Sequence, residues 1–296
     1  MQTLHYMWLD VFADRPLTGN ALCVFLDGDG LTGEQMQALA RETNLSETTF
    51  VLPPTQPGAT YRNRIFTPGG ELAFAGHPTL GTAAAVAISR GEPVTEMVQE
   101  TKSGLTPLDV AYVDGKVDRV VMVAPSPTFV AAPDPEQVAR TLGLHAADVT
   151  PAGLRPEVIA SGVQHLVIPV ASPAVLSAVR VDTAALLDLS RSLGVIGAYP
   201  FALLPEGGKA QARARLFAPL FGITEDAATG SAAAPFGAYL HRHGLLPQHA
   251  SSFWYEQGEE MGRPSRLWVE VTEQASGLQV EVGGQVRILG RGELAI

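Results

Sequence analysis

The pentapeptide Arg64-Ile65-Phe66-Thr67-Pro68 recurs in the second half of the chain as Arg215-Leu216-Phe217-Ala218-Pro219. Each copy is followed by an acidic residue and then by a helix start rich in small residues. The helix start is Ala75-Gly76-His77-Pro78-Thr79 in the first half and Thr229-Gly230-Ser231-Ala232-Ala233 in the second. A chain that repeats two features in the same order is expected to repeat a structural unit.

A third pair of matching segments lies upstream. Leu39-Ala40-Arg41 precedes Leu189-Ser190-Arg191 at nearly the same spacing as the pentapeptides. Any one match could arise by chance, but three in the same order at nearly one spacing predict an internal duplication. We therefore expect an α+β fold of two pseudo-symmetric halves.

Local patterns between these matches predict strands and helices. Apolar alternation predicts strands at 6–12 and 21–26. Thr32, followed three residues later by Gln35, predicts the capping box of a helix. Asp114-Gly115, between two apolar alternations, predicts a hairpin turn.

The boundary between the halves is predicted near the middle of the chain. Four prolines crowd the segment 125–135, which makes it the best linker candidate. We expect an N-terminal half at 1–124, joined by a last strand at about 285–296, and a C-terminal half at 130–284.

Composition excludes several classes of protein. The 296 residues include 20 Lys and Arg against 30 Asp and Glu, a net charge of −10, which argues against a nucleic-acid partner. Cys23 is the only cysteine, so neither an intrachain disulfide nor a cysteine-based metal cluster can form. No apolar run reaches the roughly 20 residues that span a bilayer, and we expect a cytoplasmic protein without a membrane partner.

The duplicated helix starts predict where a ligand binds. Two related halves would bring Gly76-His77 and Gly230-Ser231 towards a shared cleft. Each helix start carries open backbone N–H groups and roughly half a positive charge. A small carboxylate could be held there without arginine, which suits an acidic protein.

One residue breaks the symmetry of the halves. At the spacing of the upstream match, Glu47 corresponds to Gly197, so only the first half supplies a carboxylate at that strand start. A two-base racemase needs an acid or thiol on each side. The asymmetry therefore favours one residue, Glu47, that shuttles a proton, and burial would bring its pKa towards the working pH.

The chain resembles the phenazine-biosynthesis isomerase (PhzF-like) family, a branch of the diaminopimelate-epimerase-like superfamily. The motifs that carry the resemblance span nearly the whole chain in order: Asp10-Val11-Phe12, Glu42 to Thr48, Phe74-Ala75-Gly76-His77-Pro78, Asp226 to Ala232, and Gly262-Arg263-Pro264-Ser265. The resemblance implies a mixed or antiparallel sheet curled round a central helix in each half. It also implies an active-site cleft between the halves, and a homodimer.

The resemblance assigns roles to individual residues. Glu47 matches the catalytic glutamate of the family, and His77, Asp226 and Ser231 match the polar residues around the substrate. The backbone at Gly76 and Gly230 matches the carboxylate-binding helix starts. The epimerase branch has two cysteines where this chain has Ala75 and Thr229, which excludes a two-thiol epimerisation.

Other polar residues have structural explanations to weigh. Asp226 and Ser231 are of types that cap helices, which does not exclude contact with a substrate. Asn20 and Gln164 follow glycines at strand starts and are candidate substrate-binding residues, although turn chemistry alone could explain them. His241 and His243 lie at a helix end where histidine is favoured, and we expect no metal site there.

A dinucleotide fingerprint needs separate consideration. Gly28-Asp29-Gly30-Leu31-Thr32-Gly33 fits it, and Glu47 lies near the spacing of the ribose-binding acid. The acidic residues would repel a pyrophosphate, Glu47 precedes its strand, and the region before it reads as an antiparallel pair. A nicotinamide-dependent reductase is therefore disfavoured.

The sequence thus predicts a cofactor-independent isomerase that acts on a small, perhaps cyclic, carboxylate. One alternative is a racemase, epimerase or lyase that uses Glu47 on an open-chain amino or hydroxy acid. Another is a ligand- or partner-binding protein that keeps the fold without catalysis. A role in phenazine synthesis is not implied, because related proteins share motifs without sharing substrates.

Overall fold

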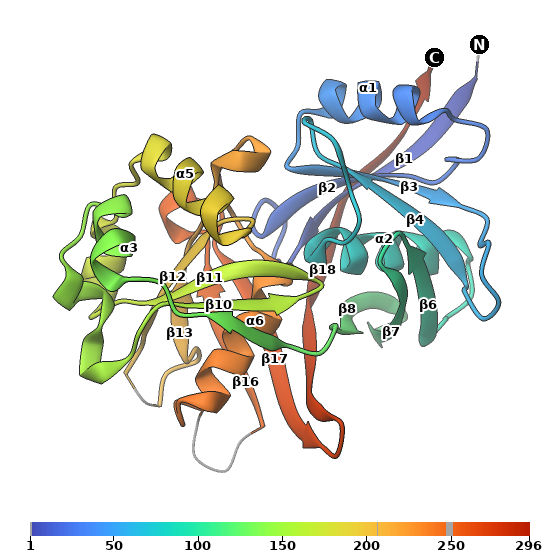
Figure 1. Ribbon diagram of the computed structural model, residues 1–296. Coiled ribbons are helices and arrows are strands. Elements are labelled where there is room, and N and C mark those ends of the chain that lie inside the picture. Colours follow the sequence, from blue (N-terminus) through green and yellow to red (C-terminus); the bar gives the residue numbers. More distant parts are fainter. Residues whose placement is uncertain (1, 206, 247–250) are drawn as a thin grey trace. The chain divides into compact units, whose positions relative to one another are not determined.

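A computed structural model describes residues 2–205, 207–246 and 251–296. The chain forms two compact units, Met1–Val123 with Gly283–Ile296, and Ala124–Val282. Both units mix strands with a few helices, so the fold is of the mixed α/β type (Figure 1). Among the described residues, no helix is long and apolar enough to cross a membrane.

The first unit consists mainly of strands. Its elements in chain order are β1 (Thr3–Val11), β2 (Asn20–Phe25), α1 (Gly33–Thr43), β3 (Glu47–Leu52), β4 (Tyr61–Phe66), β5 (Glu71–Leu72), α2 (Gly76–Ser89), β6 (Glu96–Thr101), β7 (Gly104–Val113) and β8 (Lys116–Val123). The last strand, β18 (Gly277–Ala295), contributes its part from Gly283 onwards.

The strands of the first unit close into a ring. β1 pairs with β2 and β18, β2 with β3, β3 with β4, β4 with β6, β6 with β7, β7 with β8, and β8 with β18. Helix α2 packs on seven of these strands, and its residues from Gly76 to Ala87 are all buried. A helix buried on all sides must be apolar all round, which explains why α2 is rich in alanine and glycine.

Helix α1 covers the other side of the first four strands (Figure 1). Its start has the predicted capping box, because Thr32 and Gln35 exchange side-chain and backbone hydrogen bonds of 3.2 and 2.9 Å. Met36, Leu39 and Ala40 face the core, next to a stacked Phe25–Phe50 pair and Phe66 in one cluster. This helix is amphipathic, in contrast to α2.

The second unit carries more helices. Its elements are β9 (Thr128–Ala131), α3 (Pro135–Thr141), η1 (Ala146–Val149), η2 (Pro151–Gly153), β10 (Glu157–Ser161), β11 (Val163–Pro169), α4 (Pro173–Ala178), α5 (Thr183–Leu193), β12 (Ala198–Leu203), β13 (Ala212–Ala214), β14 (Leu216–Ala218), η3 (Pro219–Phe221), β15 (Ile223–Asp226), α6 (Gly230–Arg242), β16 (Ser252–Gln257), η4 (Glu259–Met261) and β17 (Ser265–Gln274).

Strands β9, β10, β11 and β12 pair in sequence, and β11 and β12 are parallel. Helices α3, α4 and α5 bury their apolar residues against β10, β11 and β12 in one core cluster. Helix α6 packs instead on β10, β11 and β17, with Phe236 at the centre of an aromatic cluster. The second unit therefore has its most buried helix, α6, on one face of the sheet and the smaller helices on the other (Figure 1).

Several local predictions are confirmed, and one needs correction. Asp114 and Gly115 form the turn between β7 and β8, both with positive φ, as a tight hairpin of this type requires. The segment 125–135 is more than a linker, because it contains β9, which pairs with β10. Its prolines flank β9 and leave the strand's own N–H groups intact, which is why a proline-rich segment can still pair.

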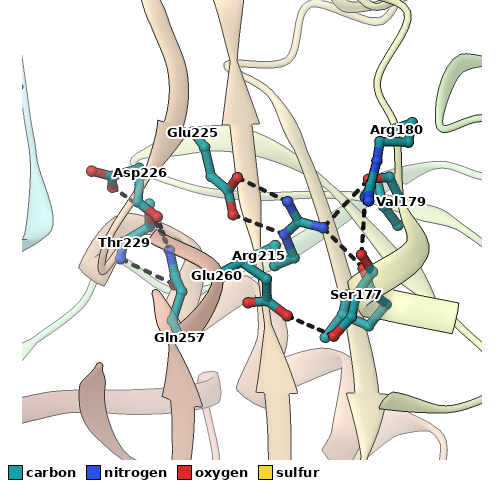
Figure 2. A network of polar contacts seen from close by, with 10 residues as sticks. Ser177, Val179, Arg180, Arg215, Glu225, Asp226, Thr229, Gln257 and Glu260 are labelled. Carbon is teal, nitrogen blue, oxygen red and sulfur yellow. Dashed lines mark hydrogen bonds and ion pairs between the residues drawn. The ribbon is translucent and has the colours of Figure 1, made fainter. Parts of the chain in front are cut away.

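The duplicated pentapeptides make the same contacts in both units. Arg64 donates from Nε and Nη2 to the two carboxylate oxygens of Glu71, at 2.8 and 2.9 Å. Arg215 donates in the same way to Glu225, at 2.8 and 2.9 Å (Figure 2). Each guanidinium also lies over the aromatic ring two residues further on, at 5.1 and 4.8 Å from its centroid. Bidentate pairs of this kind are geometrically specific, so the matched sequences encode matched local structures.

Candidate active site

Glu47 is the first residue of β3, and its carboxylate is buried in the first unit. The residue is 8% exposed, and His77, the second residue of α2, is 3% exposed. Glu47 Oε2 and His77 Nε2 lie 3.4 Å apart. The structure thus brings two of the four sequence-predicted catalytic residues into contact within one unit.

The His77 ring is neutral at physiological pH. Burial lowers the pKa of His77 from 6.5 to about 3, and a hydrogen bond with the backbone of Ala21 acts more weakly in the opposite direction. The ring next to Glu47 is therefore a neutral imidazole. A neutral ring can donate one hydrogen bond and accept another.

Asn20, the first residue of β2, contacts the other ring nitrogen of His77. Its Nδ2 lies 3.2 Å from His77 Nδ1, and its Oδ1 accepts a 3.3 Å hydrogen bond from the hydroxyl of Ser46. The hydroxyl fixes the orientation of the amide and directs its NH₂ group at the ring. Asn20, which the sequence suggests as a substrate-binding residue, contacts the predicted catalytic histidine.

The start of α2 leaves backbone donors in the first turn. Ala75 occupies the N-cap position and has no side-chain oxygen with which to cap the helix. Gly76 and His77 follow as the first two helical residues, and Thr79 donates 2.7 Å back to the carbonyl of Ala75. The amides at this helix start are suited to an anionic group of a ligand.

In the second unit, Asp226 ends β15 just before α6. Asp226 is 6% exposed, and its Oδ2 accepts a 2.6 Å hydrogen bond from the hydroxyl of Thr229, the N-cap residue of α6. Gln257, at the end of β16, bonds to both residues (Figure 2). The Asp226 carboxylate is thus held by its own loop and by a neighbouring strand.

Ser231 is the second residue of α6, and it contacts a histidine as well. His165 in β11 is wholly buried, and its Nε2 lies 3.1 Å from Ser231 Oγ. Burial lowers the pKa of His165 from 6.5 to about 3, so this ring is also neutral. Each unit therefore has a buried neutral histidine next to a polar residue of the predicted site.

Gln164 lies on the other face of β11. Successive strand residues point to opposite faces, so Gln164 and His165 cannot both face α6. The Gln164 amide lies near Gly194, at the C-terminal end of α5. A substrate contact of Gln164 stays a prediction, whereas its neighbour His165 is the residue that reaches Ser231.

The two histidines near the end of α6 face separate carboxylates. His241 Nε2 lies 3.0 Å from Glu273 Oε1, and His243 Nε2 lies 3.2 Å from Glu157 Oε1. These contacts give both rings a structural role at the helix C-terminus.

The dinucleotide-like segment forms a βαβ unit, contrary to expectation. The preceding β1–β2 pair is antiparallel as predicted, yet β2 and β3 are parallel and α1 connects them. Thr32 caps α1 with its side chain, and Glu34 lies in its first turn. Both features disfavour a pyrophosphate at this helix start, since the position is capped and beside a carboxylate.

A groove of about 620 Å³ in the first unit lies at the opposite end of α2. It is lined by Ala87, Ile88 and Gly91 together with residues of β7, β8 and β18. Lys116 and Arg291 are exposed, and the half-buried Asp118 and Arg287 form an ion pair with each other at 3.0 Å. The groove is therefore not the candidate active site.

Sequence reasoning missed the residues that support the predicted ones. Ser46, Thr229 and Gln257 make hydrogen bonds whose partners lie far along the chain or across a loop. The one feature of the sequence that could have suggested a role for Gln257 is its position next to Gly258, shortly before the motif Gly262-Arg263-Pro264-Ser265. Such contacts depend on strand order, which local sequence does not show.

Comparisons with known proteins agree with the resemblance. A family model described as phenazine biosynthesis-like protein (PhzC-PhzF) matches residues 9–292. The trans-2,3-dihydro-3-hydroxyanthranilate isomerase of Pseudomonas aeruginosa is 39% identical over 292 residues, covering 98% of this chain and 99% of the relative.

Solved structures extend the likeness to the fold. A PhzF-family phenazine biosynthesis protein of Bacillus anthracis has a TM-score of 0.88 at 29% identity, with 100% of both chains covered. A hydroxyproline epimerase of Agrobacterium vitis, solved with bound trans-4-hydroxy-L-proline, has a TM-score of 0.69 at 14% identity. That comparison covers 99% of this chain and 93% of the epimerase, and it concerns the fold alone. With a family match over nearly its whole length and a relative 39% identical across it, the chain belongs to the phenazine biosynthesis-like (PhzC-PhzF) family.

Proposed function

We propose that the protein is an isomerase that moves a proton on a small carboxylate substrate, with Glu47 as general acid and base and without a cofactor. The observation that carries this proposal is the 3.4 Å contact between buried Glu47 and the neutral ring of His77 at the start of α2. The curated relative from Pseudomonas aeruginosa is an isomerase by name, which supports the reaction class.

The proton follows a closed path in this proposal. An isomerisation leaves the composition of the substrate unchanged, so a proton removed from one carbon must return to another. Glu47 takes the proton, holds it as a neutral carboxylic acid, and returns it. The first-turn amides of α2 donate hydrogen bonds to the negative charge that develops on the substrate meanwhile, and the His77 ring stays beside Glu47.

The first substrate to test is trans-2,3-dihydro-3-hydroxyanthranilate, the compound named for the relative. It is a cyclic carboxylate, in keeping with the substrate class that the sequence predicts. Fold and motifs do not fix the substrate of an enzyme, so a phenazine pathway role does not follow from them.

The second unit is proposed to take part through Asp226, Ser231 and the backbone at Gly230. The repeated Arg–Glu pairs support an origin of the two units by internal duplication. The sequence predicts that the substrate carboxylate is held at both helix starts. Replacing Asp226 with Asn, or Ser231 with Ala, should then lower kcat in a fully folded protein, and unchanged kcat would remove the second unit from the reaction.

The test of the main proposal is proton NMR of this substrate in heavy water, with wild type and Glu47→Gln side by side. Wild type should convert the compound into its ring isomer, and deuterium at the receiving carbon would measure how often the proton held on Glu47 exchanges with solvent before it returns. Glu47→Gln should lower the rate by about a hundredfold to ten-thousandfold, the usual contribution of one general acid or base. The variant keeps the size and polarity of the side chain, so its fold and ligand binding should persist.

Two results would count against the proposal in different ways. Full turnover by Glu47→Gln would show that Glu47 is not the general acid and base. No turnover by wild type would exclude this substrate, and the same pair of proteins would then be tested on other small carboxylates.

The same glutamate could serve a racemase, epimerase or lyase on an open-chain amino or hydroxy acid. The likeness to the fold of a hydroxyproline epimerase is the observation that favours keeping this alternative. Because Ala75 and Thr229 stand where that chemistry would place two thiols, such a reaction would depend on Glu47 alone. Loss of the substrate α-hydrogen to heavy water, without ring rearrangement, would distinguish it.

A protein that binds a carboxylate without turning it over is the remaining alternative. Calorimetry that shows tight binding, together with no turnover across a broad panel of carboxylates, would favour it. A homodimer is the predicted assembly, and light scattering would decide between one copy and two.

A further inference from the structure

Gln257 is a buried glutamine that uses its whole hydrogen-bonding capacity around the loop of Asp226. It is 1% exposed, and its Oε1 accepts from the Thr229 amide at 3.2 Å and from the Tyr199 hydroxyl at 3.0 Å. Its Nε2 donates to the carbonyl of Asp226 at 2.9 Å and to Thr229 Oγ1 at 3.0 Å. An amide side chain has two donors and two common acceptor positions, and all are occupied here.

The orientation of this amide is determined by its partners. Tyr199 is wholly buried, and burial raises the pKa of its hydroxyl well above the ordinary value, so the hydroxyl keeps its proton. That proton is shared between two acceptors, because the Tyr199 hydroxyl lies 3.0 Å from the Tyr255 hydroxyl and 3.0 Å from Gln257 Oε1. The Thr229 amide can only donate, and it faces Oε1. The NH₂ group of Gln257 must then face the carbonyl of Asp226 and the hydroxyl of Thr229.

The hydrogen bond from Gln257 also sets the direction of the next one. Thr229 Oγ1 accepts from Gln257, and a hydroxyl has only one proton to donate. That proton is directed at Asp226 Oδ2, 2.6 Å away (Figure 2). The hydrogen bonds from Gln257 to Thr229 and from Thr229 to Asp226 therefore end on one oxygen of the Asp226 carboxylate and fix the orientation of that carboxylate.

The loop between Asp226 and α6 is packed so closely that it cannot easily shift. Gly258 has a φ of +82°, and a Cβ built there would lie 2.5 Å from the carbonyl oxygen of Ala227. The Ser265 hydroxyl donates to the same carbonyl at 2.9 Å. Because Gly258 has no side chain, the end of β16 can approach the backbone of the loop between Asp226 and α6.

The first unit has a glutamine–threonine pair as well, at a position that does not match. Gln99 is wholly buried on β6, accepts from the Tyr61 hydroxyl at 3.0 Å, and donates to Thr79 Oγ1 at 2.9 Å. Thr79 donates onwards to the carbonyl of Ala75, the N-cap residue of α2, whereas Thr229 is itself the N-cap residue of α6. The threonine of the second unit is therefore the one that reaches a carboxylate.

We propose that Thr229 and Gln257 are positioning residues that hold the Asp226 carboxylate in the orientation the reaction needs. The inference rests on the proposed function in one respect, namely that Asp226 contacts the substrate. Thr141 is a control outside the candidate site, because it is 3% exposed and its hydroxyl donates to the carbonyl of Gln137 within α3 at 3.0 Å. The same substitution should therefore have different effects at Thr229 and at Thr141.

The test compares Thr229→Val, Thr229→Ser and Thr141→Val in the isomerisation assay, with Glu47→Gln and Asp226→Asn as references. Valine has the shape of threonine without the hydroxyl. Thr229→Val should lower kcat by about tenfold to a hundredfold, the range for a misplaced catalytic group, with a smaller change in KM. Thr229→Ser keeps the hydroxyl and should restore most of kcat, and Thr141→Val should lower the melting temperature while kcat persists.

The outcomes separate this inference from the proposed function. If Glu47→Gln is inactive but Thr229→Val behaves like Thr141→Val, the inference is overturned and the function stands. An active Asp226→Asn variant also overturns it. Crystal structures give a readout that needs no activity: Asp226 should change its rotamer in Thr229→Val, and an unchanged rotamer would refute the positioning role.

Discussion

Glu47 Oε2 and His77 Nε2 lie 3.4 Å apart in the first unit, and neither side chain is more than 10% exposed. The two residues come from different elements, the first residue of β3 and the first turn of α2. A carboxylate and an imidazole buried this close would form an ion pair if the ring were protonated. Burial keeps the ring neutral, so the contact is not an ion pair.

The tautomer of His77 is the first prediction. Asn20 Nδ2 faces Nδ1, which should make Nδ1 the acceptor and place the ring proton on Nε2, the atom that faces Glu47. Nitrogen-15 NMR of the histidine rings distinguishes the two tautomers directly. A proton on Nδ1 would show instead that the ring donates to the backbone of Ala21.

Asn20→Asp provides the matched variant for this prediction. A carboxylate next to Nδ1 accepts a hydrogen bond where the amide donated one, so the ring proton should move to Nδ1. His77 would then lose its donor towards Glu47, and turnover should fall by about tenfold or more, the size of one lost charge-assisted hydrogen bond. Unchanged turnover with a switched tautomer would show that the donor is not used.

The dependence of stability on pH is the second prediction. The pKa values of His77 and His165 are lowered from 6.5 in the unfolded chain to about 3 in the folded one. Between these values the unfolded chain binds protons that the folded chain does not, so the free energy of unfolding should fall as the pH drops below 6.5. Each histidine contributes a slope of about 1.4 kcal/mol per pH unit in this window, and the contribution is constant above it.

Urea unfolding between pH 7.5 and 5 measures this slope above the range where most carboxylates titrate. His5 acts in the opposite direction, because a hydrogen bond with Asp27 and its charge raise the pKa of this exposed ring. His5→Gln is therefore the background for the experiment. A stability that is flat from pH 7.5 to 5 in that background would contradict the burial of the two rings as neutral groups.

The packing of α2 gives the third prediction. Gly81 lies in the buried helix, and a Cβ there would lie 2.5 Å from Leu22 Cδ2 and 2.8 Å from Val11 Cγ2. Alanine has a helix propensity better than glycine by about 1 kcal/mol, whereas overpacking of a tight core costs about 1–3 kcal/mol. We expect the overpacking to prevail, and Gly81→Ala should lower the free energy of unfolding.

Gly290→Ala is the control, since a Cβ at Gly290 meets nothing within 4 Å. Denaturant unfolding of both variants should show a loss at Gly81 and little change at Gly290. A gain in stability for Gly81→Ala would mean that the side chains of Leu22 and Val11 move aside to make room for the added methyl group.

Sequence by itself determined the features that depend on neighbouring residues or on repetition. The capping box at Thr32 and Gln35 and the turn at Asp114-Gly115 were predictable because their partners lie within a few residues. The repeated pentapeptides indicated matched structures, since the side chains that form the Arg–Glu pairs are themselves repeated. The resemblance placed Glu47 and His77 in one site through motifs that can be found without coordinates.

Tertiary structure alone decided which side chains support that site. Asn20 and His77 are far apart in the sequence, as are Gln257 and Asp226, and they meet only because particular strands lie next to particular helix starts. Pairing with β10 likewise makes the proline-rich segment contain a strand, β9. The packing of β11 on α6 places His165, and not Gln164, next to Ser231. Contacts between distant residues follow from strand pairing and burial, which a local pattern of residues cannot specify.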